Sequence, residues 1–276
     1  MVNKMNNPST PVQYQFFQNG KIEQIDAHVI VETSVSLTVN GQVWLTFMCT
    51  PTQLEALAVG FLFNEGIIKE FSEVADVRLC EHGDNVDVWL NHAADKPERW
   101  TRTSGCTGGM TSVDASTRLS AGARVDRELA HRQNDVVLSP EQIPALLAML
   151  DDDQTLYRQT GGVHTSILSD GERSILAAED IGRHNTLDKL AGQMLIDGIK
   201  PNASVILTTG RISSEMMQKA IRLGVSVVIS RTSPSSMSIE LAEKQGITLI
   251  GYAKRHRFNI YTHAERITEN VKTEQL

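Results

Sequence analysis

The sequence has 276 residues, 41% of them hydrophobic, which is enough to bury the core of one large domain or of two small ones. With a formal net charge of −7 and 5% aromatic residues, the chain lacks the basic character that general binding to nucleic acid or to a membrane surface requires. The polar start has no apolar run like that of a signal peptide, and no later segment approaches the ~20 apolar residues of a membrane span. We therefore expect a cytoplasmic protein in which any anion site is local.

The N-terminal third reads as strands with one helix. Residues 12–47 are rich in β-branched residues, and Asn40-Gly41 marks a two-residue hairpin. Thr50 followed by a proline predicts the N-cap of a helix that continues to about residue 66. A second hairpin is expected about Gly83-Asp84. We assign residues 1–100 to a smaller β-rich subdomain with one helix.

The three cysteines, Cys49, Cys80 and Cys106, are an odd number without paired spacing, which argues against a disulfide framework and fits a reducing compartment. Cys49 and Cys80 stand at predicted strand ends among apolar neighbours, so we expect both to be small core residues. His82 and Cys80 alone supply too few ligands for a metal site, and we predict no metal centre.

Cys106 lies in the sequence TSGCTGGM of residues 103–110, among glycines and small hydroxyl residues. Glycines let successive backbone N–H groups turn toward the sulfur and stabilise the thiolate, which is the reactive form of cysteine. The alternative is a flexible loop that merely contains a cysteine. Residues 110–135, with scattered apolar side chains, are expected to be a mobile lid, a partner-ordered segment or a weak amphipathic helix. We assign residues 101–138 to this loop and connection.

Residues 139–276 predict an α/β subdomain. After a short helix to about residue 150, a hairpin turns at Asp170-Gly171, and helices and strands then alternate as far as a last strand at 258–262. This order implies a mostly parallel sheet covered by helices.

Basic residues recur where the predicted strands end, in the region where open α/β sheets bind ligands. Arg183, Arg211 and Arg231 each precede a helix, where a cation opposes the helix dipole and needs a compensating anion. Structural ion pairs with nearby carboxylates remain an alternative for each arginine. Together with residues 254–257 (KRHR), which suit a diphosphate, they favour a phosphate-bearing ligand.

Other chemistry is disfavoured by the motifs. His164 and His184 could be acid–base groups, but a lone histidine is more often structural, and we assign neither to catalysis. A zinc deaminase requires His-x-Glu and Pro-Cys-x-x-Cys, and a dithiol redox centre requires Cys-x-x-Cys, neither of which occurs. A cysteine phosphatase would need an arginine where Ser112 stands.

Four motifs occur in order and together resemble the FdhD family of formate dehydrogenase accessory proteins. They are TGGVHTS at 160–166, EDIGRHNTLDK at 179–189, GRISSEM at 210–216 and SRTSP at 230–234. The resemblance extends from about Thr33 to the last strand. It implies a cytidine-deaminase-like three-layer sheet with helices, without the zinc chemistry, and a homodimer.

The resemblance also implies a function. The protein would accept sulfur from a cysteine desulfurase and transfer it to the molybdenum bis(guanine dinucleotide) cofactor before that cofactor enters formate dehydrogenase. By position, Cys106 matches the cysteine that carries the persulfide, as in a sulfurtransferase-type carrier. No permanently bound cofactor is expected. Many members have a second loop cysteine where Gly109 stands here. Carrying sulfur as a persulfide needs only one cysteine, whereas passing sulfur between two loop cysteines would need both.

The resemblance assigns cofactor binding to one segment, whose residues are Tyr252, Ala253, Lys254, Arg255, His256 and Arg257. Two rival functions remain. In the first, the protein is a chaperone that binds and docks the guanylated cofactor, and Cys106 merely lines the pocket. In the second, it is a nucleotide-hydrolysing enzyme, which the missing metal ligands disfavour.

Overall fold

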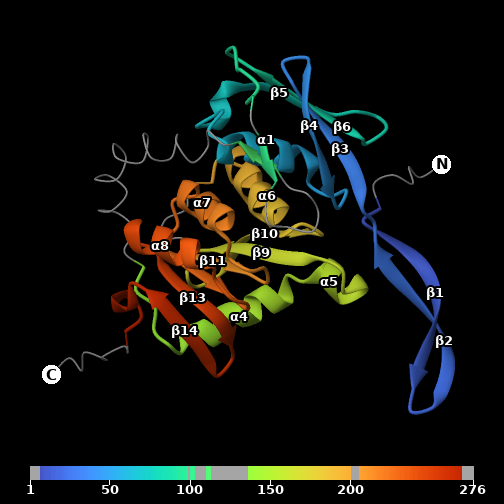
Figure 1. Ribbon diagram of the computed structural model, residues 1–276, viewed down its shortest axis with the longest axis vertical. Helices are drawn as coiled ribbons and strands as arrows, with labels where there is room; N and C mark the ends of the chain where they lie inside the picture. The colour runs from blue at the N-terminus through green and yellow to red at the C-terminus, as the bar shows by residue number, and fades with distance from the viewer. Residues whose placement is uncertain (1–6, 99, 103–109, 113–135, 200–204, 269–276) are drawn as a thin grey trace.

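The computed structural model describes residues 7–98, 100–102, 110–112, 136–199 and 205–268 (Figure 1). The N-terminal strands and helix are β1 (Ser9–Gln18), β2 (Lys21–Ile30), β3 (Thr33–Val39), β4 (Gln42–Cys49), α1 (Leu54–Asn64), β5 (Val74–Leu79) and β6 (Asn85–Leu90). Two short strands, β7 (Trp100–Arg102) and β8 (Met110–Ser112), then pair with each other. The later elements are α4 (Gln142–Asp152), α5 (Thr155–Thr160), β9 (His164–Ser169), β10 (Ser174–Asp180), α6 (Arg183–Ile196), β11 (Val205–Thr208), α7 (Ser214–Arg222), β12 (Val227–Ser230), α8 (Ser236–Lys244), β13 (Thr248–Lys254) and β14 (Arg257–Thr262).

The smaller β-rich subdomain is confirmed. Its sheet has the strand order β4-β3-β6-β5, and α1 packs on one face through side chains such as Leu57 and Phe61. The predicted hairpin turns at Asn40 and Gly41, with φ of 48° and 78°, values that the twist of a two-residue hairpin requires.

The predicted start of α1 is wrong. The helix begins at Leu54 after Gln53, which has a left-handed backbone, and Thr50 does not cap it. The Thr50 amide instead donates to Asp180 (3.1 Å), and its hydroxyl oxygen accepts from the Ile181 amide (3.1 Å). A tertiary contact therefore uses the groups that a local cap would need.

The main sheet has six strands in the order β10-β9-β11-β12-β13-β14. Only β11, β12 and β13 pair in parallel, and the remaining pairs are antiparallel, so the expected mostly parallel sheet is corrected to a mixed one. The reason lies in the connections: tight turns join β9 to β10 and β13 to β14, and such turns can join only antiparallel strands.

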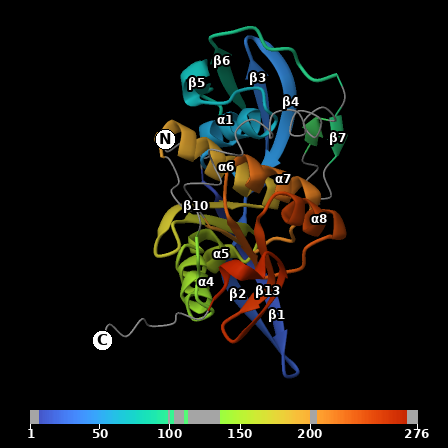
Figure 2. The same ribbon diagram turned by 90° about the vertical axis from the view of Figure 1, so that its left-hand side faces the viewer.

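Helices cover both faces of this sheet, which confirms the three-layer α/β architecture (Figures 1 and 2). In β11, Val205 and Leu207 pack toward α4, whereas Ile206 packs toward α6, α7 and α8. We call these faces the α4 side and the α8 side. Within the described residues, no helix is both long and apolar enough to cross a membrane.

The β1–β2 hairpin forms a separate two-stranded ribbon that projects from the body (Figure 1). Most of its side chains are exposed, including Phe17 at 68% and Ile22 at 66% near its tip. An isolated hairpin of this kind is marginally stable in water. The ribbon is therefore a candidate contact surface.

Helices α1 and α6 join the two subdomains at a close crossing. A Cβ atom on Gly60 would lie 1.8 Å from the Asp188 carbonyl oxygen, and one on Gly192 would lie 1.8 Å from that of Ala56. Backbone thus meets backbone, and only glycine fits at either position.

Replacement of Gly60 by alanine is expected to force the helices apart and to lower the free energy of unfolding by about 3 kcal/mol or more. Urea unfolding would measure the loss. The matched control is Gly198→Ala, because Gly198 has a positive φ but open space around it and should lose only about 1 kcal/mol. Equal losses in the two variants would contradict the close crossing.

Candidate functional site

The predicted junctions meet at one edge of the main sheet. The carboxyl ends of β10, β11, β12 and β13 lie there together with the start of β9, because β9 runs opposite to its two neighbours. Asp180 pairs with His164 in the register, and Thr208 lies between Ser166 and Ser230. We call this region the strand-end edge.

The two carboxylates at the end of β10 are bound internally. Glu179 accepts hydrogen bonds from the Leu156 and Tyr157 amides (2.6 and 2.9 Å) at the start of α5, a helix that the sequence patterns did not predict. Asp180 is fully buried and accepts from the amides of Thr50 and Gly182 and from the side chain of Asn185. Neither carboxylate is therefore free to neutralise the strand-end arginines.

Asp180 also forms a buried ion pair with Lys189, whose Nζ lies 2.7 Å from its Oδ2. Both side chains have zero exposure. The Lys189 ammonium donates further to the Thr50 carbonyl, the Thr52 hydroxyl and the Glu179 carbonyl (3.1–3.2 Å). A buried pair needs such additional hydrogen bonds to offset its desolvation. This set ties the β4–α1 connection to the strand-end edge.

Buried hydroxyl groups connect the central strands near this edge, an arrangement that the sequence patterns did not predict. Ser166 Oγ lies 2.7 Å from the Thr186 hydroxyl and donates to that of Thr208 (2.8 Å), which accepts from the Gly210 amide (3.1 Å). Ser230 donates to the Gly210 carbonyl (2.8 Å). The available signal was a Ser or Thr directly beside the apolar run of each of these strands. The network fixes the turn that carries Arg211.

Both histidines of the edge contact hydroxyl groups. His184 Nε2 lies 3.3 Å from Ser213 Oγ, and burial, reinforced by the nearby Lys219 and Arg183 charges, lowers the pKa of His184 to about 2. His164 Nδ1 lies 3.3 Å from the Thr209 hydroxyl, and its pKa is lowered mainly by burial and by Arg183. Both imidazoles are thus neutral at pH 7.

The three strand-end arginines differ in their environment. Arg231 forms an ion pair with Asp151 of α4, which is the structural alternative that the sequence left open. Arg183 is buried, with 6% exposure, whereas Arg211 is exposed. Of the ion pairs within the described residues, none includes Arg211.

The predicted cofactor-binding segment forms the end of β13 and the turn into β14. Lys254 pairs with Arg257 in the register, and both are exposed, as are Arg255 and His256. Ala253 is buried against α4, and Tyr252 is 48% exposed. In the part of the chain that the structure describes, no ion pair includes this turn. Its positive charge is therefore available to a ligand.

Cys106 lies outside the described residues, in the connection between β7 and β8. The two described cysteines are free thiols. Cys49 is fully buried, as expected, and burial together with the Asp180 charge raises the pKa of its thiol to about 12, which makes it unreactive at neutral pH. Cys80 is only half-buried, contrary to the expectation of a core residue, because its thiol donates to Asp84 (3.0 Å) at the hairpin turn.

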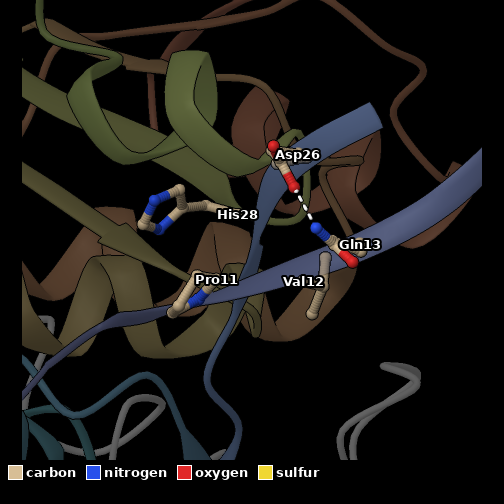
Figure 3. A pocket seen from close by; sticks show the side chains of 6 residues that line it. Pro11, Val12, Gln13, Asp26 and His28 are labelled. Atoms are coloured by element: carbon tan, nitrogen blue, oxygen red, sulfur yellow. Dashed lines mark hydrogen bonds between the residues drawn. The ribbon is translucent and has the colours of Figure 1, made fainter. Parts of the chain in front are cut away.

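Two shallow pockets border the ribbon rather than the strand-end edge. One is lined by residues 11–13 and 26–28, where Gln13 donates to Asp26 (2.8 Å) (Figure 3). The other lies between the ribbon and α5. Neither gathers the cations that a phosphate-bearing ligand needs. Across the described ranges, no cluster of His, Cys, Asp and Glu could hold a metal ion.

Replacing Lys189 by methionine should leave the buried Asp180 charge without a partner and lower the free energy of unfolding by about 3–5 kcal/mol. The double variant with Asp180→Asn should lose less, because it leaves no unpaired buried charge. Arg173→Met is the matched control, since its pair with Asp170 is exposed and should contribute at most about 1 kcal/mol. Urea unfolding of the variants measures these losses, and equal effects in Lys189→Met and Arg173→Met would contradict the buried pair's role.

Known proteins similar to this chain span nearly its whole length. It is 34% identical over 260 residues to the sulfur carrier protein FdhD of Bacillus subtilis, covering 92% of this chain and 95% of that one. It is 31% identical to the protein of the same name from Shouchella clausii, covering 95% and 97%. A crystal structure of a formate dehydrogenase accessory protein from Desulfotalea psychrophila matches with a TM-score of 0.73 and 28% identity, over 95% of this chain and all of that one.

The family model described as FdhD/NarQ matches residues 30–268, which include β3 through β14 and both sides of the strand-end edge. The ribbon strand β1 lies before the matched region. The chain belongs to the FdhD/NarQ family.

Proposed function

We propose that this protein is a sulfur carrier required for formate dehydrogenase activity. The proposal is supported by the relatives named sulfur carrier protein FdhD and by the similar formate dehydrogenase accessory protein. The observation that carries it in this chain is the exposed cationic turn at residues 254–257, at a strand-end edge where Glu179 and Asp180 are bound by other groups. Such a turn suits an anionic ligand larger than one phosphate.

In the proposed reaction, the Cys106 thiolate attacks the terminal sulfur of a persulfide on a cysteine desulfurase. A new S–S bond forms on Cys106, the desulfurase S–S bond breaks, and the desulfurase cysteine leaves as a thiolate, so no net oxidation occurs. Cys106 is the proposed acceptor because its loop suits a thiolate, whereas Cys49 is buried and protonated and the Cys80 thiol donates its proton to a hydrogen bond with Asp84. Gly109 leaves no second thiol in the loop to resolve the persulfide.

The proposed acceptor of this sulfur is the molybdenum bis(guanine dinucleotide) cofactor, which binds as a substrate. Its diphosphates would lie against Lys254, Arg255 and Arg257, with Arg211 as a further cation of the same edge. The S–S electron pair stays on Cys106, which returns to the thiolate, while the molybdenum centre supplies the two electrons that convert the transferred sulfur to a sulfido ligand. Binding supplies proximity, and neither neutral histidine has to move a proton.

We also propose a homodimer in the cytoplasm, with formate dehydrogenase as the final recipient of the cofactor. The exposed apolar ribbon supports a protein contact, since Tyr14, Phe16 and Phe17 are 40–68% exposed. The free thiols of Cys49 and Cys80 suit a reducing compartment. A monomer mass in sedimentation equilibrium would contradict the dimer.

Complementation of a strain that lacks this protein distinguishes a sulfur carrier from a chaperone that only binds the cofactor. Cys106→Ser should lower formate dehydrogenase activity by at least about tenfold, because a hydroxyl group cannot form a persulfide. Lys254→Glu should also lower it, because the reversed charge repels the diphosphates. Lys69→Glu, an exposed lysine remote in sequence from the turn, is the matched control and should complement fully. Full activity with Cys106→Ser and loss with Lys254→Glu would instead favour the cofactor chaperone.

A further inference from the structure

The ribbon strand β1 has an edge that no other strand covers. In the part of the chain that the structure describes, β1 pairs with β2 alone, over ten residues and without a break in register. No charged residue occurs in β1, whereas β2 carries charges such as Lys21, Glu23 and Asp26. Native edge strands are usually short, bulged or charged, and a long, regular edge without charges is a template for pairing with another chain.

The backbone groups that point out from this edge can be identified. Hydrogen-bonded pairs alternate along an antiparallel ribbon. Because the Val31 amide donates to the Pro8 carbonyl (2.8 Å), the even-numbered residues of β1 bond to β2, and the odd-numbered ones direct their N–H and C=O groups away from it. Pro11, which has no N–H group, is odd-numbered, as the edge position requires. Beyond it, the odd-numbered residues of the run 13–17 each offer a donor and an acceptor.

The side chains of β1 favour a second copy of the same strand as the partner. Val12, Tyr14 and Phe16 share one face of the ribbon, because strand side chains alternate, and the two aromatic residues are 47% and 40% exposed. A strand without charges meets no like-charge repulsion when it lies against its own copy. Antiparallel pairing of two identical strands also has the two-fold symmetry of most homodimers.

Pro11 also selects the register of this pairing. The run 13–17 avoids the proline, and it pairs with its own copy about Gln15, which then lies opposite Gln15 of the second copy. Tyr14 lies opposite Phe16 of the second copy in a pair that is not hydrogen-bonded, where side chains approach most closely. The two ribbons thus gain a shared apolar face and the additional strands that an isolated hairpin lacks.

We infer that β1 is a dimerisation strand: it pairs antiparallel with β1 of a second copy of this chain, centred on Gln15, and joins two ribbons into one four-stranded sheet. The inference rests on the homodimer of the proposed function and assigns an interface to it. The family model matches residues 30–268, so β1 lies in a part of the chain that this match does not include.

Disulfide trapping tests the register. In a Cys106→Ser background, which removes the loop thiol, Gln15→Cys should give a disulfide-linked dimer on mild oxidation, because the two Cα atoms would lie about 5.5 Å apart. Gln24→Cys is the matched control, since Gln24 is exposed and lies opposite Gln15 in the ribbon. In the four-stranded sheet it would lie about 14 Å from its copy, too far for a disulfide. Non-reducing electrophoresis measures the linked fraction.

Sedimentation equilibrium of the full chain tests the backbone pairing. Gln15→Pro removes an N–H that points out from the ribbon and should raise the dimer dissociation constant by about tenfold or more, because one carbonyl of each copy loses its donor. The hydrogen bonds between β1 and β2 do not use this N–H, so the ribbon is kept. Gln24→Pro makes the equivalent change at the outer edge of β2 and should stay within about twofold of the parent.

Three results would overturn the inference, and they can be told apart. If the parent is a dimer but the two cysteine variants cross-link equally, or neither cross-links, the dimer uses another surface and the proposed function stands. If the two proline variants raise the dissociation constant equally, the edge of β1 has no special part in the interface. If the parent is a monomer, the proposed homodimer fails together with this interface, whereas the proposed sulfur carriage is unaffected.

Discussion

The buried ion pair between Lys189 and Asp180 is the interaction on which the arrangement of this protein depends. The lysine lies on α6 and the aspartate at the end of β10, and together they hold the backbone and side chains of the β4–α1 connection at Thr50 and Thr52. The pair thus joins the β-rich subdomain to the main sheet next to the close crossing of α1 and α6. It also fixes the Gly182 amide, which places Arg183 and His184 at the start of α6.

The strand-end edge separates its polar groups by role. Carboxylates and hydroxyl groups form hydrogen bonds and ion pairs within the protein. They accept from the first amides of α5, pair with Lys189 and connect the central strands. Cations remain at the surface, on the turn at 254–257 and at Arg211. An acidic chain can in this way present a local site for an anionic ligand, and an exposed cationic turn recruits phosphates without the cost of burying its charges.

Much of the fold follows from sequence patterns. The last strand, predicted at 258–262, forms at Arg257–Thr262, the Asn40-Gly41 hairpin turns as predicted, and the four basic junctions meet at one edge. The local pattern failed where a tertiary contact took over the same group, since Thr50 binds Asp180 and does not cap α1. For Arg231, the structure shows the ion pair with Asp151 that the sequence had left as an alternative. The bulge in β13 was equally hidden, because only the tertiary structure shows it: the register with β14 shifts between Gly251 and Lys254, and Ala253 packs on the α4 side. The assignment of sulfur carriage to Cys106 rests on family resemblance and loop chemistry, since that residue lies outside the described part of the chain.

Sulfur carriage on Cys106 can be tested directly by anaerobic intact-mass spectrometry after incubation with a cysteine desulfurase and cysteine. We expect the parent chain to gain the mass of one or more sulfur atoms and Cys106→Ser to gain none, because Cys49 is buried and protonated and the half-buried Cys80 thiol donates to Asp84. Equal gains in both proteins, or no gain in either, would contradict sulfur carriage on Cys106.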